Sequence, residues 1–373
     1  MSTPLVVFGE DWGAHPSSTQ HIIRCLMQER DVVWVNSIGL RRPKVSMSDI
    51  GRVFKKGFSA LSSNKGVQAT VTPQAVVCPL VIPVPKNTLE RNFNRISLGC
   101  KIRQALSKFP AERPILWTSL PTAVDFLGCS NERAVVYYCG DDFSGLAGVD
   151  HAQVTEAEQR LVERADLILA ASKCLANKFP KSKTVHLPHG VDVDLFSSPS
   201  PRPADLPMDH PVAGFYGSIS DWLDVELLGQ VAKALPEWRF VFIGNIRTDV
   251  SSLMRRDNVR FLGPKPHHEL PGYAQNWTVS LLPFRDNAQI RACNPLKLRE
   301  YLSTGTPIVS TNFPALDNYR DLISVADEPI GFAQAISNVL KHPDTSHTKR
   351  FECVAKETWK NRAQAVSSLL SAL

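Results

Sequence analysis

Along the chain, short runs of apolar and largely β-branched residues alternate with stretches of helical character. The runs occupy residues 5–8, 32–35, 115–118, 134–138 and 167–171 in the first half, and 212–216, 240–243, 279–282 and 308–310 in the second. Runs that are apolar throughout are typical of parallel strands that helices cover on both faces. The pattern therefore predicts an α/β protein with parallel sheets.

The segment 197–203 is rich in Pro and Ser and is the obvious linker. With a length of 373 residues, the chain is long enough for two domains that each bury a core. We expect two Rossmann-like domains that face each other across a cleft, formed by residues 1–196 and 197–350. Residues 348–373 read as one long amphipathic helix without a following strand, so the last part, 351–373, is expected to cross back to the first domain.

The composition is that of a soluble globular protein, with 43% apolar and 21% charged residues. No run approaches the roughly 20 apolar residues of a membrane span, and no basic-then-apolar leader opens the chain. The eight Cys are scattered without a CxxC pair, which is typical of reduced thiols rather than of disulfides or a zinc site. We expect a cytoplasmic protein that needs no metal or other cofactor.

The net charge of +6 is unevenly spread, because residues 39–113 carry fourteen Lys and Arg against three acidic residues. Such a surface can attract an anionic membrane, a phosphorylated acceptor or nucleic acid, and a solvated surface without any partner explains it as well. Nucleic acid is disfavoured, since the segment has no RNP, zinc-finger or helix-turn-helix signature and few aromatic residues. Peripheral association with the inner membrane face stays open.

The most informative stretch is NPLKLREYL at 294–302, followed by GTPIV. Asn294 is expected to cap a helix whose first residue is Pro295. Lys297 follows in the first turn, and Glu300 lies one turn further on the same face. A helix N-terminus beside a cation suits a diphosphate, and the Glu can accept hydrogen bonds from a ribose. The stretch therefore points to a nucleotide-diphosphate sugar.

Arg291 strengthens this interpretation. Arg291 and Lys297 bracket the helix start, where cations are unfavourable beside the positive end of the helix dipole unless an anion lies between them. The alternative is a capped surface helix with an ordinary ion pair.

Two further segments follow predicted strands. In GFYGSISDW at 214–222, the strand ends at Gly217, and Ser218 or Ser220 is expected to cap the next helix. A ligand could approach this backbone closely, although a generic strand-to-helix turn explains the same residues. In VVYYCGDDF, Asp141 and its neighbour Asp142 come just after a strand, where open α/β sheets hold ligands. They either act on an acceptor hydroxyl or cap the next helix, and both interpretations remain open.

The loop after the first strand is rich in hydrogen-bonding side chains. Trp12 could stack on a sugar, while His15, Gln20 and His21 could bind hydroxyls or phosphate, although a single Trp or His is more often structural. The HxxH at 186–189 has no third ligand at a suitable spacing, so we interpret it as an interdomain turn rather than a metal site.

These motifs together resemble a known family. The matching segments are LPHGVDVDLF at 187–196, GFYGSISDW at 214–222, WRFVFIGN at 238–245, VRFLGPKPHHELPGYAQNWTVSLLPF at 259–284 and NPLKLREYLSTGTPIVST at 294–311. In this order and spacing the chain resembles glycosyltransferases of the GT-B fold, in the large retaining group called family 4. It is most similar to bacterial enzymes that build surface polysaccharides, including the teichuronic-acid type.

The resemblance implies that the second domain binds the nucleotide sugar and the first the acceptor. Glu300 matches the family's ribose-binding Glu, and Lys297 a diphosphate-binding Lys. Gly217 and Ser218 match the loop near the donor phosphates. Leu262 lies in the strand end whose backbone receives the base.

Three positions depart from the family pattern. Ala292 stands where the family often has a Glu that holds the donor sugar, and Gly140 where a His follows the first-domain strand. Asp221-Trp222 stands near the place of the usual Arg, whose charge Arg291 could supply.

The expected activity is transfer of a sugar from a nucleotide-diphosphate sugar to a saccharide or lipid-linked acceptor, with retention at the anomeric carbon. Arg291 and Lys297 would stabilise the leaving diphosphate, and Asp141 would orient the acceptor. A nucleotide-sugar epimerase on the same fold and a non-catalytic sugar-nucleotide sensor or scaffold remain alternatives. A dinucleotide oxidoreductase is disfavoured, because no GxGxxG follows the first strand.

Overall fold

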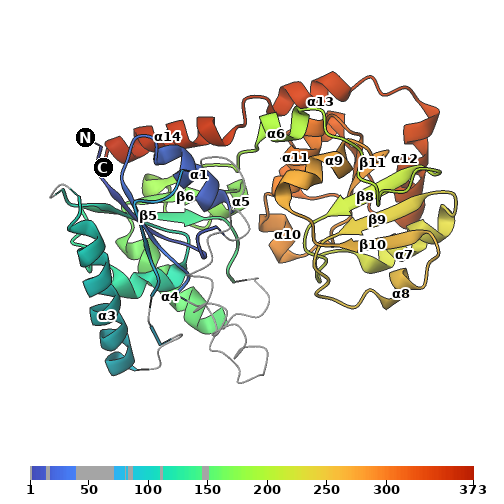
Figure 1. The fold of residues 1–373 in the computed structure, drawn as a ribbon. Coiled ribbons are helices and arrows are strands. Elements are labelled where there is room, and N and C mark those ends of the chain that lie inside the picture. Colours follow the sequence, from blue (N-terminus) through green and yellow to red (C-terminus); the bar gives the residue numbers. More distant parts are fainter. Residues whose placement is uncertain are drawn as a thin grey trace. The chain divides into compact units, whose positions relative to one another are not determined.

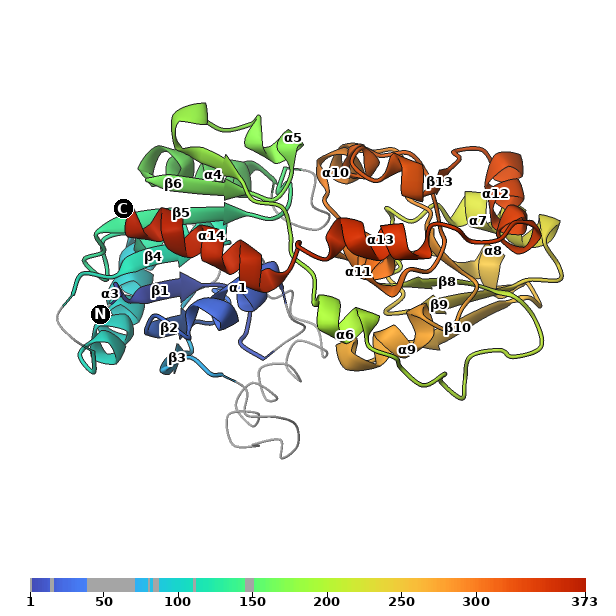
Figure 2. The same ribbon diagram turned by 90° about the horizontal axis from the view of Figure 1, so that it is seen from above.

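The computed structural model describes residues 2–13, 17–38, 71–79, 81–82, 87–109, 112–144 and 151–373. The chain divides into two compact units (Figures 1 and 2). The first unit comprises Met1–Ala170, Leu175–His186 and Ala363–Leu373, and the second comprises Ala171–Cys174 and Leu187–Arg362.

The first unit is built on a parallel sheet with the strand order β3-β2-β1-β4-β5-β6-β7. Its strands are β1 Leu5–Phe8, β2 Val32–Val35, β3 Ala75–Val77, β4 Ile115–Thr118, β5 Ala134–Cys139, β6 Leu167–Ala170 and β7 Thr184–His186. Every residue of β1, β2, β4, β5 and β6 is buried, as the uninterrupted apolar runs predict. The strand order reverses between β1 and β4, and such a switch point is where open α/β sheets bind ligands.

Helices cover both faces of this sheet. They are α1 Ser18–Leu26, α3 Thr88–Leu106, α4 His151–Arg164, the short α5 Lys173–Ala176, the 3₁₀ turns η1 Pro121–Phe126 and η2 Lys181–Lys183, and α14 Trp359–Ser371 at the C-terminus. Helices α1 and α14 lie on one face, and α3 and α4 on the other (Figure 1). The Arg30 guanidinium fixes α14 by donating to the Ser367 carbonyl at 3.4 Å and to Ser371 Oγ at 3.2 Å.

The second unit repeats this topology with the strand order β10-β9-β8-β11-β12-β13. Its strands are β8 Val212–Tyr216, β9 Arg239–Ile243, β10 Val259–Gly263, β11 Val279–Leu282, β12 Ile308–Ser310 and β13 Ser324–Val325. Its helices are α6 Val193–Ser197, α7 Val225–Ala234, α8 Ser251–Met254, α9 Leu270–Ala274, α10 Ala288–Ala292, α11 Leu296–Thr304, α12 Pro329–Lys341 and α13 His347–Val354, with 3₁₀ turns η3 His267–Glu269, η4 Pro314–Leu316 and η5 Arg320–Leu322. The predicted class, α/β with two parallel Rossmann-like sheets, is confirmed.

The boundary between the units lies earlier than the predicted one at residue 197. Residues 187–196 belong to the second unit because they pack and bond within it. Val191 donates its N–H to the Glu357 carbonyl at 2.9 Å, and Phe196 is completely buried in the core of the second unit. The Pro- and Ser-rich segment 197–203 is therefore a surface segment of the second unit and not the boundary between the two units.

The prediction of one long C-terminal helix is wrong. Helix α13 ends at Val354 and α14 begins at Trp359, with Ala363–Leu373 grouped in the first unit. Between them the Glu357 side chain bonds to Arg299 and Tyr319, and Thr358 pairs with Val191. These tertiary contacts outweigh the helix propensity of the segment.

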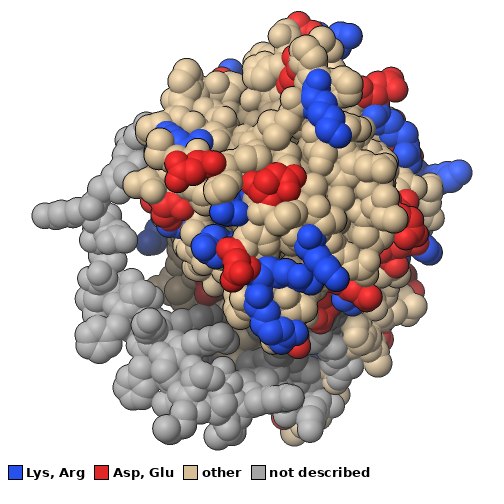
Figure 3. All heavy atoms as spheres, turned by 90° about the vertical axis from the view of Figure 1, so that its right-hand side faces the viewer, with Lys and Arg blue, Asp and Glu red and all other residues tan. Residues whose placement is uncertain are grey.

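The charge distribution is described only in part. On the face of the second unit that Figure 3 shows, Lys and Arg side chains lie among Asp and Glu side chains. Much of the basic segment 39–113, including residues 39–70, lies outside the described residues. The predicted basic surface therefore stays a prediction. None of the described helices combines the length and hydropathy that a membrane crossing needs.

Candidate functional site

The carboxyl ends of β8 and β9 bring two glycines into close contact. Gly217 follows β8 with a φ of 133°, in the region that favours glycine, and donates its N–H to the Ile243 carbonyl at 2.8 Å. A Cβ on Gly244 would lie 1.9 Å from the Gly217 carbonyl oxygen, so Gly244 must lack a side chain. At the end of β8, the turn therefore has no side chain at Gly217 and packs against Gly244, which also lacks one. Gly217 was predicted from the sequence and Gly244 was not.

Lys297 of α11 lies against this turn. A Cβ on Gly217 would lie 2.8 Å from Lys297 Nζ. The ammonium lies 5.1 Å from the ring centroid of Phe215 and 5.6 Å from that of Phe284. Burial lowers the pKa of Lys297. Within the described residues, the ammonium has no hydrogen bond or ion pair, so this half-buried cation is open to an anionic ligand.

The N-terminus of α11 is also open. The helix begins at Leu296, with Pro295 in the cap position and no side-chain cap. The prediction that Asn294 caps the helix is wrong. Its buried side chain donates from Nδ2 to the Ala171 carbonyl and accepts from Arg299 Nη1, each at 2.6 Å. Asn294 is therefore held by protein groups rather than open to a nucleotide, and the first N–H groups of α11 remain for a ligand.

Glu300 lies one turn beyond Lys297 and is held by two side chains that the sequence analysis did not identify. Glu300 Oε2 accepts from the Tyr216 hydroxyl at 2.7 Å, and Oε1 lies 3.1 Å from His267 Nε2. A carboxylate has about four acceptor directions, so lone pairs are left for ribose hydroxyls. His267 lies in the quoted stretch PKPHHELP, and only the tertiary contact shows its role.

The electrostatics of this group favour an ionised Glu300. Burial alone would lower the pKa of His267, but the hydrogen bond and the charge of Glu300 outweigh burial and raise it. Burial would raise the pKa of Glu300, but the bond to His267, the charge of His267, the Tyr216 hydroxyl and Lys297 together lower it. The pair therefore holds an oriented carboxylate beside the open cation.

Two other predicted donor-side residues lie at neighbouring strand ends. Ser218 Oγ is 2.8 Å from Ser220 Oγ, and neither serine caps the next helix as predicted, because α7 begins later with Asp224 as its N-cap. Leu262 lies at a register shift of β10, since Phe261 pairs with Phe242 and Gly263 with Ile243. The bulge leaves Leu262 without a register partner on β9.

Arg291 is not brought to this group. It lies in the last turn of α10 with an exposed side chain, and its Nε and Nη2 each donate to Asp286 at 2.6 Å. No described contact joins it to Lys297, Gly217 or Glu300. The expectation that Arg291 and Lys297 share one anion lacks support, because Asp286 already neutralises the Arg291 charge.

In the first unit, two of the predicted acceptor-binding residues, Trp12 and Gln20, pack on or bond to neighbouring protein groups. The Trp12 ring lies 4.8 Å from the Trp34 ring and below the Arg24 guanidinium. Gln20 is completely buried and donates from Nε2 to Glu10 Oε1 at 2.7 Å, so it cannot contact an acceptor as predicted.

The structure does not test the predicted acceptor-binding role of the two histidines of this loop. His21 is half-buried on α1, and His15 lies outside the described residues. Their acceptor-binding role stays a prediction.

The pair Asp141 and Asp142 separates into two roles. Asp142 Oδ1 accepts from Lys178 Nζ at 2.7 Å and from the Ser144 N–H at 3.1 Å. Burial would raise the pKa of Asp142, but these bonds outweigh it and lower the pKa. Asp141 is exposed just beyond β5, and within the described residues its carboxylate has no hydrogen-bond partner. Asp142 is thus the structural residue, and Asp141 is available to a ligand.

The HxxH segment is divided between surface and core. His186 ends β7 and is exposed, whereas His189 is buried. Burial, with the charges of Arg299 and Arg362, lowers the pKa of His189 to about 3. In the described part of the chain, His, Cys, Asp and Glu form no group of three that would hold a metal ion.

Part of the second unit is similar to a known protein family. Residues 210–342 match the model of the family described as glycosyl transferases group 1. The chain is 31% identical over 254 residues to TuaH of Bacillus subtilis (strain 168), named as a candidate teichuronic acid biosynthesis glycosyltransferase; the match covers 61% of this chain and 64% of TuaH. It is 26% identical over 201 residues to WcaL of Escherichia coli (strain K12), named as a candidate colanic acid biosynthesis glycosyltransferase, covering 50% of this chain and 48% of WcaL. The matched region thus spans less than two thirds of each relative.

Solved structures match the whole chain. Anabaena HepE in complex with UDP and glucose has a TM-score of 0.72 at 14% identity, with 100% of both chains covered. Sucrose-phosphate synthase from Thermosynechococcus elongatus also has a TM-score of 0.72, at 16% identity, with 100% of this chain and 99% of the other covered. These similarities establish the GT-B fold.

Proposed function

We propose that this protein, whose residues 210–342 are a group 1 glycosyltransferase domain in a chain of GT-B fold, transfers a sugar from a nucleotide-diphosphate sugar to an acceptor hydroxyl. The transfer retains the anomeric configuration and serves the synthesis of a cell-surface polysaccharide or glycolipid. One observation carries the proposal: the Lys297 ammonium, which makes no hydrogen bond or ion pair with a described residue, lies beside the Gly217 turn on the uncapped helix α11. The names of TuaH and WcaL and the UDP in the HepE complex support it.

On the donor side, Lys297 and the first N–H groups of α11 bind the diphosphate and stabilise the charge that develops as it leaves. Glu300, oriented by Tyr216 and His267, accepts hydrogen bonds from the ribose hydroxyls. The backbone at Leu262 receives the base. We propose UDP as the nucleotide and a hexose as the sugar, on the example of the HepE complex with UDP-glucose.

On the acceptor side, Asp141 orients the attacking hydroxyl. In a front-face reaction the departing phosphate helps to accept the hydroxyl proton, so Asp141 need not be a strong base. The acceptor is a saccharide or a lipid-linked saccharide, and the basic segment 39–113 holds the cytoplasmic enzyme at the inner membrane face. The reaction uses no metal, so excess EDTA should leave the rate unchanged.

Two measurements on the full-length protein test the proposal. Thermal shift with a panel of nucleotides should show stabilisation by UDP, because a ligand that binds the folded state raises the apparent stability by about 2.7 kcal/mol at one hundred times its Kd. Labelled UDP-hexoses are then incubated with and without saccharide and lipid-linked acceptors. Release of UDP that depends on the acceptor supports transfer.

The remaining outcomes favour the alternatives. Isomerisation of the donor without acceptor would indicate an epimerase, and binding without turnover a sensor or scaffold. If no nucleotide stabilises the protein, the proposal fails.

A further inference from the structure

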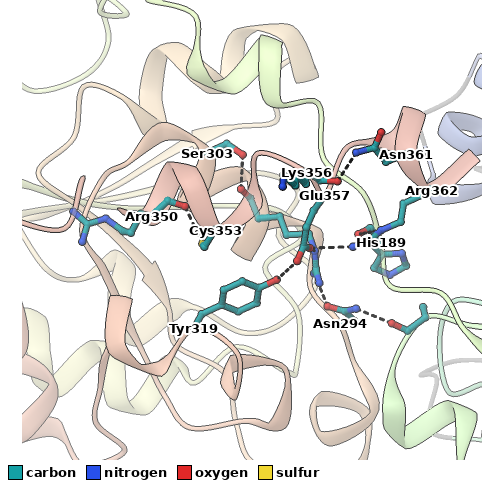
Figure 4. A network of polar contacts seen from close by, with 12 residues as sticks. His189, Asn294, Ser303, Tyr319, Arg350, Cys353, Lys356, Glu357, Asn361 and Arg362 are labelled. Atoms are coloured by element: carbon teal, nitrogen blue, oxygen red, sulfur yellow. Dashed lines mark hydrogen bonds and ion pairs between the residues drawn. The ribbon is translucent and has the colours of Figure 1, made fainter. Parts of the chain in front are cut away.

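Arg299 belongs to the same helix as Lys297 and Glu300 but is held by a separate group of polar side chains. Figure 4 shows Asn294, Tyr319 and Glu357 of this group. Its Nε donates to Glu357 Oε2 at 2.5 Å, and its Nη1 to Asn294 Oδ1 at 2.6 Å. The other carboxylate oxygen of Glu357 accepts from the Tyr319 hydroxyl at 2.9 Å. Helix α11 is therefore anchored on one side by charged bonds while its other side presents the candidate donor site.

The same group reaches the places where the chain passes from one unit to the other. These passages follow residues 170, 174, 186 and 362. Asn294 donates to the Ala171 carbonyl at 2.6 Å. Arg362 Nη2 lies 3.2 Å from Glu357 Oε2, and its Nε donates to the His189 carbonyl at 3.3 Å. Within the second unit, hydrogen bonds and ion pairs thus join three segments to one another or to the start of α11. These segments are 171–174, 187–191 and 357–362.

These bonds are difficult to break separately. Arg299 is 4% exposed, and a buried guanidinium that loses its partner is left without hydration, which is strongly unfavourable. Packing adds a further constraint, since a Cβ on Gly190 would lie 2.8 Å from the backbone nitrogen of Trp359. A displacement of α11 therefore moves Glu357 and the segments bonded to it.

We infer that Arg299, Glu357 and Asn294 form a positioning cluster that couples ligand binding at Lys297 and Glu300 to the segments through which the two units are connected. The inference rests on the proposed donor role of α11 and adds to it a route by which an occupied donor site changes the stability of segments 171–174 and 187–193. The three residues act through α11 and contact no reacting atom.

Hydrogen exchange on the full-length protein without ligand tests the cluster directly. In Asn294→Ala, peptides covering 171–174 and 187–193 should exchange at least about fivefold faster, because local opening no longer has to break the bonds of the Asn294 amide to Ala171 and Arg299. Asn258→Ala is the matched control. Asn258 is also 7% exposed, as Asn294 is, and its Nδ2 also donates to backbone carbonyls, those of Ala232 and Leu235. It should leave both peptides unchanged.

A second variant keeps the test valid if Asn294→Ala folds poorly. Asn294→Asp retains an acceptor for Arg299 and loses the donor to Ala171. Exchange should therefore increase in 171–174 while 187–193 stays protected. Faster exchange in neither peptide, or equal effects in Asn258→Ala, would overturn the inference.

Ligand binding and kinetics separate this inference from the proposed function. UDP should protect 294–305 in the wild type and in Asn294→Ala, but should protect 187–193 only in the wild type. The kcat for transfer should fall about tenfold in Asn294→Ala, with the donor KM within about threefold, a pattern that mere destabilisation does not produce. UDP protection of 187–193 that persists in the variant overturns the coupling. Absence of any UDP protection in the wild type overturns the proposed donor instead.

Discussion

The two units share a strand order, yet their candidate residues behave in opposite ways. In the second unit, the side chains of Tyr216 on β8 and His267 on η3 converge on Glu300. The Lys297 ammonium beside them makes no hydrogen bond or ion pair with a described residue. In the first unit, the polar side chains of the loop after β1 contact protein groups nearby, since Gln20 is bonded to Glu10 and Trp12 packs on Trp34. Polar composition alone is thus a poor indicator of a ligand site. A charged side chain without a hydrogen bond or ion pair is a better indicator.

Lys297→Ala should show the largest effect. Removal of one positioned charge from a developing anion typically costs about 10²–10³-fold in rate, so kcat for sugar transfer should fall by about that factor. Steady-state kinetics with a labelled donor measure it. The free energy of unfolding should change little, because Ala is the best helix former.

Lys233→Ala on α7, where the side chain is exposed, is the matched control for Lys297→Ala and should keep full activity. A Lys297→Ala variant with an intact fold and a wild-type rate would remove the main support for the donor site.

Gln20→Ala tests the other side of the comparison. The change leaves the half-buried Glu10 carboxylate without its amide donor, which should cost about 1 kcal/mol in the free energy of unfolding. The acceptor KM of the folded variant should stay within about twofold of the wild type. A large rise of acceptor KM at unchanged stability would show that the loop binds the acceptor after all.

Several features of the fold were predictable from the sequence because they depend on local pattern. The buried strands follow from uninterrupted apolar runs, and the turn at Gly217 from a glycine after a strand. The errors concern tertiary contacts between distant segments. Asn294 resembles a helix cap, but its amide bonds to Ala171, more than a hundred residues away. His267 and Tyr216 meet Glu300 only through the sheet.

The pairing of His267 with Glu300 should make stability depend on pH, with an amplitude of about 1.5 kcal/mol for a hydrogen bond to a charged group. The raised pKa of His267 means that its contribution is complete below the ordinary value of 6.5 and is lost as pH rises through the folded pKa. The lowered pKa of Glu300 means that its contribution is present above the ordinary value of 4.5 and is lost as pH falls through the folded pKa.

Urea unfolding of the wild type and His267→Gln between pH 4 and 9 measures this dependence. The difference between the two should be largest between about pH 4.5 and 6.5 and should decrease above that range. A difference that is constant across the whole range would mean that the pair carries no charge interaction.

Arg291→Ala should show the smallest effect and sharpens the comparison within the second unit. Arg291 and Asp286 are 62% and 64% exposed, and water screens an ion pair that is so exposed, so it contributes little to stability. We expect transfer rates within about threefold of the wild type and an equally small effect of Asp286→Ala. If Arg291 instead left Asp286 to bind the diphosphate, Arg291→Ala would reduce kcat about as strongly as Lys297→Ala. Asp286→Ala would then increase donor affinity by freeing the guanidinium. The two variants therefore decide whether one cation or two serve the leaving group.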